Sequence, residues 1–176
     1  RDPLEVCASS YQYALRSSES WLHVGKAELG GRSYQQYYRA SSVETGLAVE
    51  CRRSMKELRQ MAELYQATRR AGAVLTLRFE EIESGFDDAM RKVFAFAGAA
   101  RASAAPRDVE RMGSLLKAAA RHDLGRAARD LGAHVSNASQ KAPLRAMLQR
   151  PGDALAGELR RLRRDLDYPT ETEVGS

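Results

Sequence analysis

The sequence is short of cysteine and of long apolar runs, and each of these two shortages excludes a class of protein. Two cysteines and 5 prolines occur among 176 residues, which is too little cysteine for a disulfide-rich scaffold or a cysteine-based metal site. No run approaches the roughly 18–20 consecutive apolar residues of a transmembrane helix, so we expect no membrane contact from this segment. Hydrophobic residues make up 43% of the chain, which is enough for a folded core.

Basic residues exceed acidic residues by a modest margin. Lysine and arginine number 28 against 23 acids, which gives a net charge of +5. Polyanion binding is therefore one function to consider. Most of the surplus is arginine on helical patterns that acids interrupt, as in residues 153–166, and this pattern is typical of a solvated helix face. Nucleic acid is therefore not the expected partner.

Helical periodicity covers most of the chain. Asp2 and Pro3 suit the N-cap and first position of a helix, because aspartate accepts from free amides and proline lacks a donor that the first turn leaves unused. Gly72 ends the longest periodic run. The predicted helices span about residues 3–16, 33–39, 46–70, 86–97, 108–121, 123–131 and 153–166, with a polar loop at 134–143 and a disordered tail at 169–176.

One segment has the pattern of a β-strand. Residues 73–79 are apolar, short and partly β-branched, and they lie between Gly72 and a pair of acids. This pattern is typical of a buried parallel strand, which we place at about 74–80. Helix, strand and helix at these lengths indicate an α/β fold.

The first nine residues combine groups that bind anions. Arg1 offers a bidentate guanidinium, the helix start offers free amides and a positive dipole end, and Ser9 offers a hydroxyl. Together they suit a phosphate, although many helices begin with Asp-Pro and carry a serine for structural reasons alone. The chain opens on Arg1 rather than methionine, and we infer an amino-terminal truncation.

Three segments resemble one enzyme family. Arg1–Tyr11 resembles the 3′-phosphate-binding motif of sulfotransferases that use 3′-phosphoadenosine-5′-phosphosulfate (PAPS), in which a serine follows an arginine by eight residues. Val74–Ile82 is similar to the family's strand ending in aromatic-Glu-Asp-Leu, and Met90–Gly98 is similar to its helix ending in Phe-Leu-Gly. Order and spacing agree over residues 1–98, and the likeness is loose over 99–168.

The resemblance implies a fold, a reaction and a cofactor. The fold would be an incomplete P-loop-type parallel sheet with flanking helices, and residues 1–168 would form the carboxy-terminal part of one sulfotransferase-like domain. The parent enzyme would transfer a sulfuryl group from PAPS to the hydroxyl or amine of an acceptor such as a glycan or a small molecule. The family's 5′-phosphosulfate loop and catalytic base precede the arginine motif. The catalytic residues are therefore expected upstream of Arg1, and the chain alone is expected to be inactive.

The resemblance also assigns cofactor-binding residues. Arg1 and Ser9 would hold the 3′-phosphate, and Phe79 would lie near the adenine. Ser136 and Lys141 would belong to a late phosphate-contacting loop. Phe79 equally suits a core position, and the other two equally suit a solvated loop. The region that would pack near the acceptor contains four aromatic residues and a histidine: Trp21, His23, Tyr34, Tyr37 and Tyr38. The three tyrosines equally suit a helix packed on a core.

Two other functions compete with sulfuryl transfer. A basic helical module could bind nucleic acid or a partner protein through the arginine-rich segment 153–166, without being an enzyme. Its affinity would fall steeply with salt, whereas a 3′-phosphate pocket would prefer a 3′,5′-bisphosphate to a 5′-monophosphate. A P-loop kinase relative is disfavoured because no Gly-x-x-x-x-Gly-Lys-Ser/Thr motif occurs in the sequence.

Overall fold

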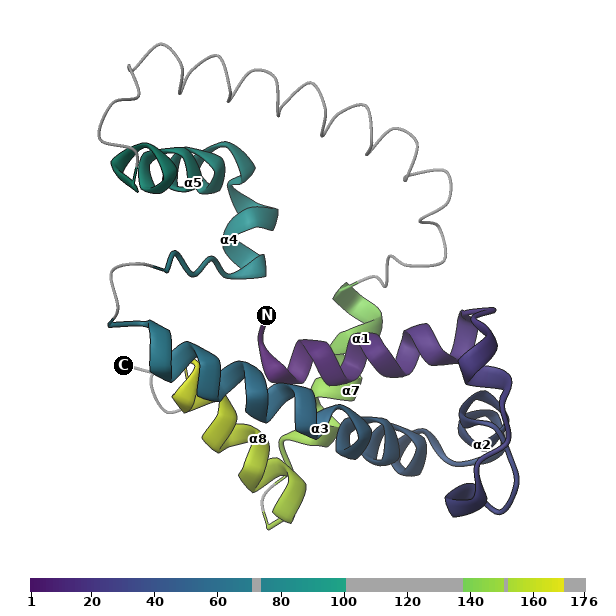
Figure 1. Ribbon diagram of the computed structural model, residues 1–176. Helices are drawn as coiled ribbons and strands as arrows, with labels where there is room; N and C mark the ends of the chain where they lie inside the picture. Colours follow the sequence, from purple (N-terminus) through teal and green to yellow (C-terminus); the bar gives the residue numbers. More distant parts are fainter. Residues whose placement is uncertain (71–73, 101–137, 151, 170–176) are drawn as a thin grey trace. The chain divides into compact units, whose positions relative to one another are not determined.

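A computed structural model describes residues 1–70, 74–100, 138–150 and 152–169 of the chain. The chain divides into two compact units. The larger unit comprises Asp2–Ala67 and Ala133–Ser176, and the smaller unit comprises Arg1 and Thr68–Gly132. Both are helical where they are described (Figure 1).

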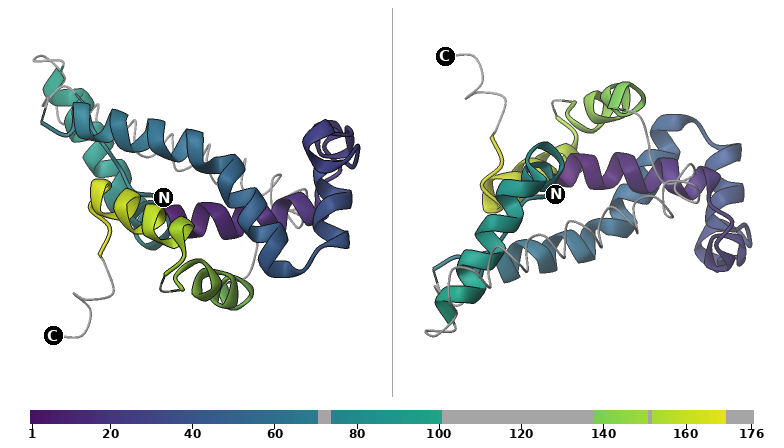
Figure 2. Two further views of the ribbon diagram at one scale, coloured as in Figure 1. Left: turned by 90° about the horizontal axis from the view of Figure 1, so that it is seen from below. Right: turned by 90° about the horizontal axis from the view of Figure 1, so that it is seen from above.

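The larger unit is an assembly of helices from both ends of the sequence. Its elements are α1 (Pro3–Arg16), the short 3-10 helices η1 (Ser20–His23) and η2 (Ala27–Leu29), α2 (Tyr34–Ala40), α3 (Val43–Thr68), α7 (Ala138–Leu148) and α8 (Ala154–Asp165). Figure 2 shows α7 and α8 lying against α1, and α2 packs against the other end of α1. The first helix in the sequence is therefore central to the unit.

Local signals explain where these helices begin. The Asp2 carboxylate accepts a 2.9 Å hydrogen bond from the Leu4 amide, and Pro3 occupies the first turn of α1. Ser33 caps α2, and its own amide donates to the Gln36 side chain, which completes a capping box. Asp153 caps α8 by accepting from the Leu155 amide. The helices predicted at 3–16, 33–39, 46–70 and 153–166 are confirmed with small shifts at their ends.

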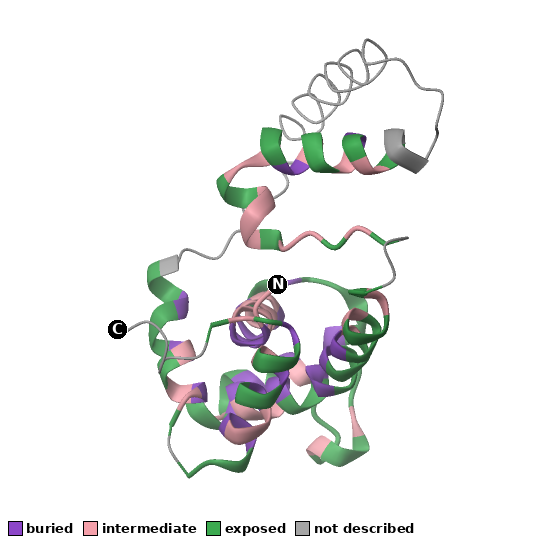
Figure 3. Cartoon of the chain, turned by 90° about the vertical axis from the view of Figure 1, so that its left-hand side faces the viewer, coloured by how far each residue is buried: buried purple, intermediate pink, exposed green. Residues whose placement is uncertain are grey.

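The core of the larger unit lies where the apolar faces of these helices meet (Figure 3). Alternation of polar and apolar positions at helical spacing supplies one apolar face to each helix. The most buried side chains include Leu4, Cys7, Tyr11, Leu22, Tyr38, Leu47, Cys51, Met55, Leu58, Leu155, Leu159 and Leu162.

Gly46 of α3 makes room for the ring of Tyr11 from α1. A Cβ atom at this position would lie 2.9 Å from Cε2 of Tyr11. The Tyr11 ring is buried and therefore has little room to retreat. The absence of a side chain at Gly46 thus lets the Tyr11 ring pack against α3.

The predicted α/β fold with a P-loop-type parallel sheet is wrong for the described residues, which contain no strand. Residues 74–78 have neither helical nor strand structure, and the predicted strand ends inside α4 (Phe79–Ser84). The acids that suggested a strand exit instead start this helix, because the Glu81 carboxylate accepts from the Arg78 amide at 2.9 Å. Val74 is 47% exposed, and no described strand lies beside it to share a hydrogen-bond ladder.

The remaining elements follow the prediction in part. The smaller unit continues with α5 (Phe86–Ala100), which confirms the helix predicted at 86–97. Ser84, the last residue of the preceding helix α4, donates to the Glu80 carbonyl. Part of the loop predicted at 134–143 is helical, because α7 begins at Ala138 and includes Pro143. The helices predicted at 108–121 and 123–131 lie outside the described residues, as does most of the predicted tail.

Candidate functional site

One polar face of α1 makes ion pairs and hydrogen bonds to α7. Glu5, Ser9, Gln12 and Arg16 follow one another at spacings of four, three and four residues, which places them along one side of the helix. The carboxylate of Glu5 lies 2.6 Å from Nη1 of Arg145. Its other oxygen lies 3.2 Å from Nζ of Lys141. This face is therefore covered by basic residues of α7.

The same face continues as hydrogen bonds to α7. The Gln12 amide nitrogen donates to the carbonyl of Gln140 at 3.1 Å, and the Arg16 guanidinium donates to the side-chain oxygen of Gln140 at 2.9 Å. Glu5, Gln12 and Arg16 thus all reach α7, and Ser9 lies between them in sequence.

Ser9 is the unsatisfied member of this face. Its Oγ atom is buried and has no hydrogen-bond partner among the described residues, and the same is true of Oε1 of Gln12. An unsatisfied buried polar group costs about 1–3 kcal/mol. The Ser9 hydroxyl, one helical turn beyond the Glu5 and Lys141 pair, is therefore a donor that no residue in the described part of the chain uses.

The residues predicted to bind the cofactor fall into two groups. Ser9 and Lys141 share the interface between α1 and α7 in the larger unit. Arg1 and Phe79 meet in the smaller unit, where the guanidinium carbon of Arg1 lies 3.9 Å from the ring centroid of Phe79. Phe79 begins α4 and is partly exposed rather than a core residue. Ser136 lies outside the described residues.

The carboxylate of Asp2 occupies the N-terminus of α1. Asp2 caps the helix and also pairs with Arg163 of α8, whose Nη2 lies 3.1 Å from Asp2 Oδ2. Both side chains are largely buried. Part of the positive field expected at this helix start is therefore used by the protein itself.

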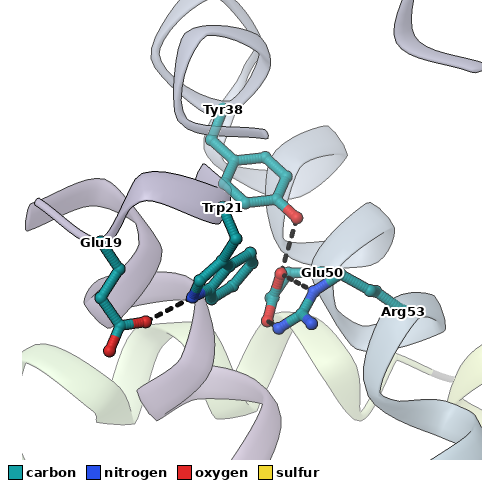
Figure 4. Close-up of polar contacts among 5 residues, drawn as sticks. All are labelled: Glu19, Trp21, Tyr38, Glu50 and Arg53. Atoms are coloured by element: carbon teal, nitrogen blue, oxygen red, sulfur yellow. Dashed lines mark hydrogen bonds and ion pairs between the residues drawn. The ribbon is translucent and has the colours of Figure 1, made fainter. Parts of the chain in front are cut away.

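A second polar cluster lies beside the aromatic residues (Figure 4). Glu50 of α3 is fully buried and accepts a 2.6 Å hydrogen bond from the Tyr38 hydroxyl. Arg53, one turn further along α3, donates to the same carboxylate from Nε at 2.8 Å and also through Nη2. Burial and the bond to Glu50 raise the pKa of Tyr38. The bond to Glu50 likewise raises the pKa of Arg53.

The guanidinium of Arg53 lies on aromatic rings. Its central carbon is 5.0 Å from the ring centroid of Trp21 and 5.7 Å from that of Tyr34, which are cation–π distances. Trp21 is partly exposed and donates from Nε1 to Glu19, as Figure 4 shows. Arg53 therefore links a buried carboxylate to an aromatic surface.

The aromatic residues of the predicted acceptor region divide between core and surface. Tyr38 is buried and packs against Tyr11, Tyr34 and Tyr37 with ring centroids 5.6–6.3 Å apart. Trp21 and His23 are exposed. A groove of about 330 Å³ lies nearby, between α1 and α3, and its lining includes Ser10, Arg53, Glu57 and Met61. The structure thus supports the core interpretation for Tyr38, and it leaves Trp21 on the surface.

Glu5, Glu50, Arg53 and Arg145 were not singled out from the sequence. Glu50 carries a usable signal, because it interrupts the apolar stripe of α3 between Leu47 and Cys51. An acid in such a stripe must find a partner. Glu5 and Arg145 carry no such signal, since both belong to polar positions of their helices.

Comparisons with known proteins find no match for the chain, and its described part has no membrane-spanning helix and no metal-binding cluster. No protein-family model matches the chain, and neither a curated protein nor a solved structure matches it. Within the described ranges no helix is long and apolar enough to cross a membrane. In those ranges His, Cys, Asp and Glu also form no cluster of three that could hold a metal ion.

Proposed function

We propose that the chain is part of a sulfotransferase and supplies residues that bind the 3′-phosphate of PAPS. The observation that supports this proposal is the unsatisfied hydroxyl of Ser9, buried one turn from the Glu5 and Lys141 ion pair. Ser9 and Lys141 were both expected at the nucleotide from the sequence resemblance. They are far apart in the sequence, yet both belong to the interface between α1 and α7.

The donor set suits a phosphate dianion. Ser9 offers a neutral hydroxyl and Lys141 an ammonium, and a charge-assisted bond from an ammonium is about twice as strong as a neutral one. Glu5 holds Lys141 and Arg145 at the site and balances their charge when no phosphate is present. When bound, PAPS supplies the sulfuryl group and leaves as adenosine 3′,5′-bisphosphate. No residue of this chain is assigned as the catalytic base.

Calorimetric titration of the full chain tests the proposal. Adenosine 3′,5′-bisphosphate should bind more tightly than adenosine 5′-monophosphate, because only the former carries the 3′-phosphate. Ser9→Ala should weaken the bisphosphate about 2- to 10-fold, the loss of one neutral donor. Ser10→Ala is the matched control, since Ser10 faces the groove between α1 and α3. Equal affinity for the two nucleotides, or equal losses in the two variants, would remove the support for a 3′-phosphate site.

A basic binding module remains the second candidate, and one observation favours it. Arg160, Arg161 and Arg164 of α8 are exposed, and none of them has an ion-pair partner among the described residues. A polyanion could bind there. Affinity for heparin that falls steeply between 50 and 200 mM salt, together with indifference to the 3′-phosphate, would favour this candidate over the first.

A further inference from the structure

The two cysteines of the chain meet in the core of the larger unit. Cys7 lies on α1 and Cys51 on α3, and both side chains are 0% exposed. The sequence contains no other cysteine. The only two cysteines of the sequence thus contact each other. Neither a well-packed core nor the proposed phosphate site requires cysteine at these positions.

At the crossing of α1 and α3, Tyr11 packs on Gly46, where the missing side chain leaves room for the Tyr11 ring. Cys7 is one turn before Tyr11 on α1, and Cys51 is just over one turn beyond Gly46 on α3. Both cysteines belong to the same buried cluster as Tyr11. They lie within hydrogen-bonding reach, and this bond, with burial, raises the pKa of Cys7.

We propose that Cys7 and Cys51 are disulfide partners, and that their bond fastens α1 to α3 when the chain meets a disulfide oxidant such as oxidised glutathione. The thiolate of one cysteine attacks the oxidant, forms a mixed disulfide and releases one reduced glutathione. The second thiolate attacks the mixed disulfide and releases another. Two protein thiols and one oxidised glutathione thus become one protein disulfide and two reduced glutathiones.

Burial determines when this exchange occurs. A thiolate is disfavoured in an apolar core, so the folded thiols are poor nucleophiles. Exchange therefore proceeds through transient opening of the crossing, and re-closure brings the two sulfurs together again. The resulting bond would link α1, which carries Ser9, to α3, which carries Glu50 and Arg53. It would also remove loop-closure entropy from the unfolded chain. This inference does not depend on the proposed nucleotide site.

The test uses the reduced full chain in native buffer with graded ratios of oxidised to reduced glutathione. Intact-mass measurement should show the loss of two hydrogens, and peptide mapping should place the bond between Cys7 and Cys51. The oxidised protein should melt about 5–15 °C above the reduced protein. Cys51→Ala is the control, because it leaves one cysteine and should show no intramolecular bond and no such oxidant-dependent rise.

Two results would overturn the proposal. In the first, both thiols stay reduced, or carry only glutathione, at every ratio that oxidises a reference dithiol. In the second, the bond forms but leaves the melting temperature unchanged or lowers it, which would mean that the folded crossing does not accommodate it. Because no refolding step is involved, failure to refold cannot obscure either result.

Discussion

Lys141 and Glu5 form an ion pair, with Nζ 3.2 Å from Oε2, that fastens α7 to α1. The Arg145 guanidinium occupies the other oxygen of the same carboxylate. The Lys141 and Glu5 side chains are 11% and 18% exposed, so water screens their attraction less than that of a surface pair. One carboxylate on the first helix therefore organises two cations from a helix late in the sequence.

Replacing that carboxylate should loosen α7. Glu5→Gln leaves Lys141 and Arg145 facing each other without a countercharge, and we expect the free energy of unfolding to fall by about 1–3 kcal/mol. Urea denaturation at constant ionic strength measures this change. Glu63→Gln on the exposed side of α3 is the control and should alter stability by less than about 0.5 kcal/mol. Similar losses in both variants would show that Glu5 is not the anchor of α7.

Gly46 should resist substitution although it lies in a helix. Alanine normally stabilises a helix interior by about 1 kcal/mol relative to glycine. At Gly46 the new Cβ would meet the buried Tyr11 ring at 2.9 Å, so we expect a net destabilisation of about 1–3 kcal/mol. Gly157→Ala in α8 is the matched control, because its nearest contact would be the flexible end of Arg160 at 3.9 Å. Thermal unfolding should show opposite signs for the two changes.

Tyr38 should contribute to alkaline unfolding. Burial and the bond to Glu50 raise its pKa in the folded state, whereas in the unfolded state it titrates near 10. Its contribution is therefore complete below about pH 10 and is lost as the pH rises above that value, because only the unfolded state releases the proton. Removing this titration should make the pH dependence of stability shallower.

The variant for this test is Tyr38→Phe. Above pH 10 the slope of unfolding free energy against pH should be less steep than in the wild type, by up to about 1.4 kcal/mol per pH unit. Urea titrations from pH 9 to 11 measure the two slopes. Other titrating groups contribute equally to both slopes, so the difference between wild type and variant reports Tyr38 alone. Parallel curves for the two proteins would contradict the prediction, even if the variant is less stable throughout.

Arg1 should discriminate between nucleotides if the proposed function holds. Arg1→Ala removes a charge-assisted partner of the 3′-phosphate and should weaken adenosine 3′,5′-bisphosphate about 10- to 100-fold. Adenosine 5′-phosphosulfate lacks the 3′-phosphate and should be nearly unaffected. Calorimetry decides the point, and equal losses for both ligands would contradict it.

The erroneous strand shows where local patterns mislead. Residues 74–78 satisfy the composition of a buried strand, but a strand exists only when a neighbour completes its hydrogen bonds. Among the described residues no such neighbour exists, and Glu81 caps a helix at the Arg78 amide instead. The residues of this segment are compatible with an extended strand and with the start of a helix, and the neighbouring structure decides which of the two forms.

The sequence alone determined which residues become helices and which side of each helix is apolar. Asp2 and Pro3 start α1, the apolar period of α3 marks its buried face, and Asp153 starts α8, because caps and periodicity act between neighbours in the chain. Only the tertiary structure decided which faces meet. Lys141 at Glu5 and Cys7 at Cys51 join residues far apart in the sequence. A helical period assigns a residue to a face, but packing selects the partner of that face by shape and charge.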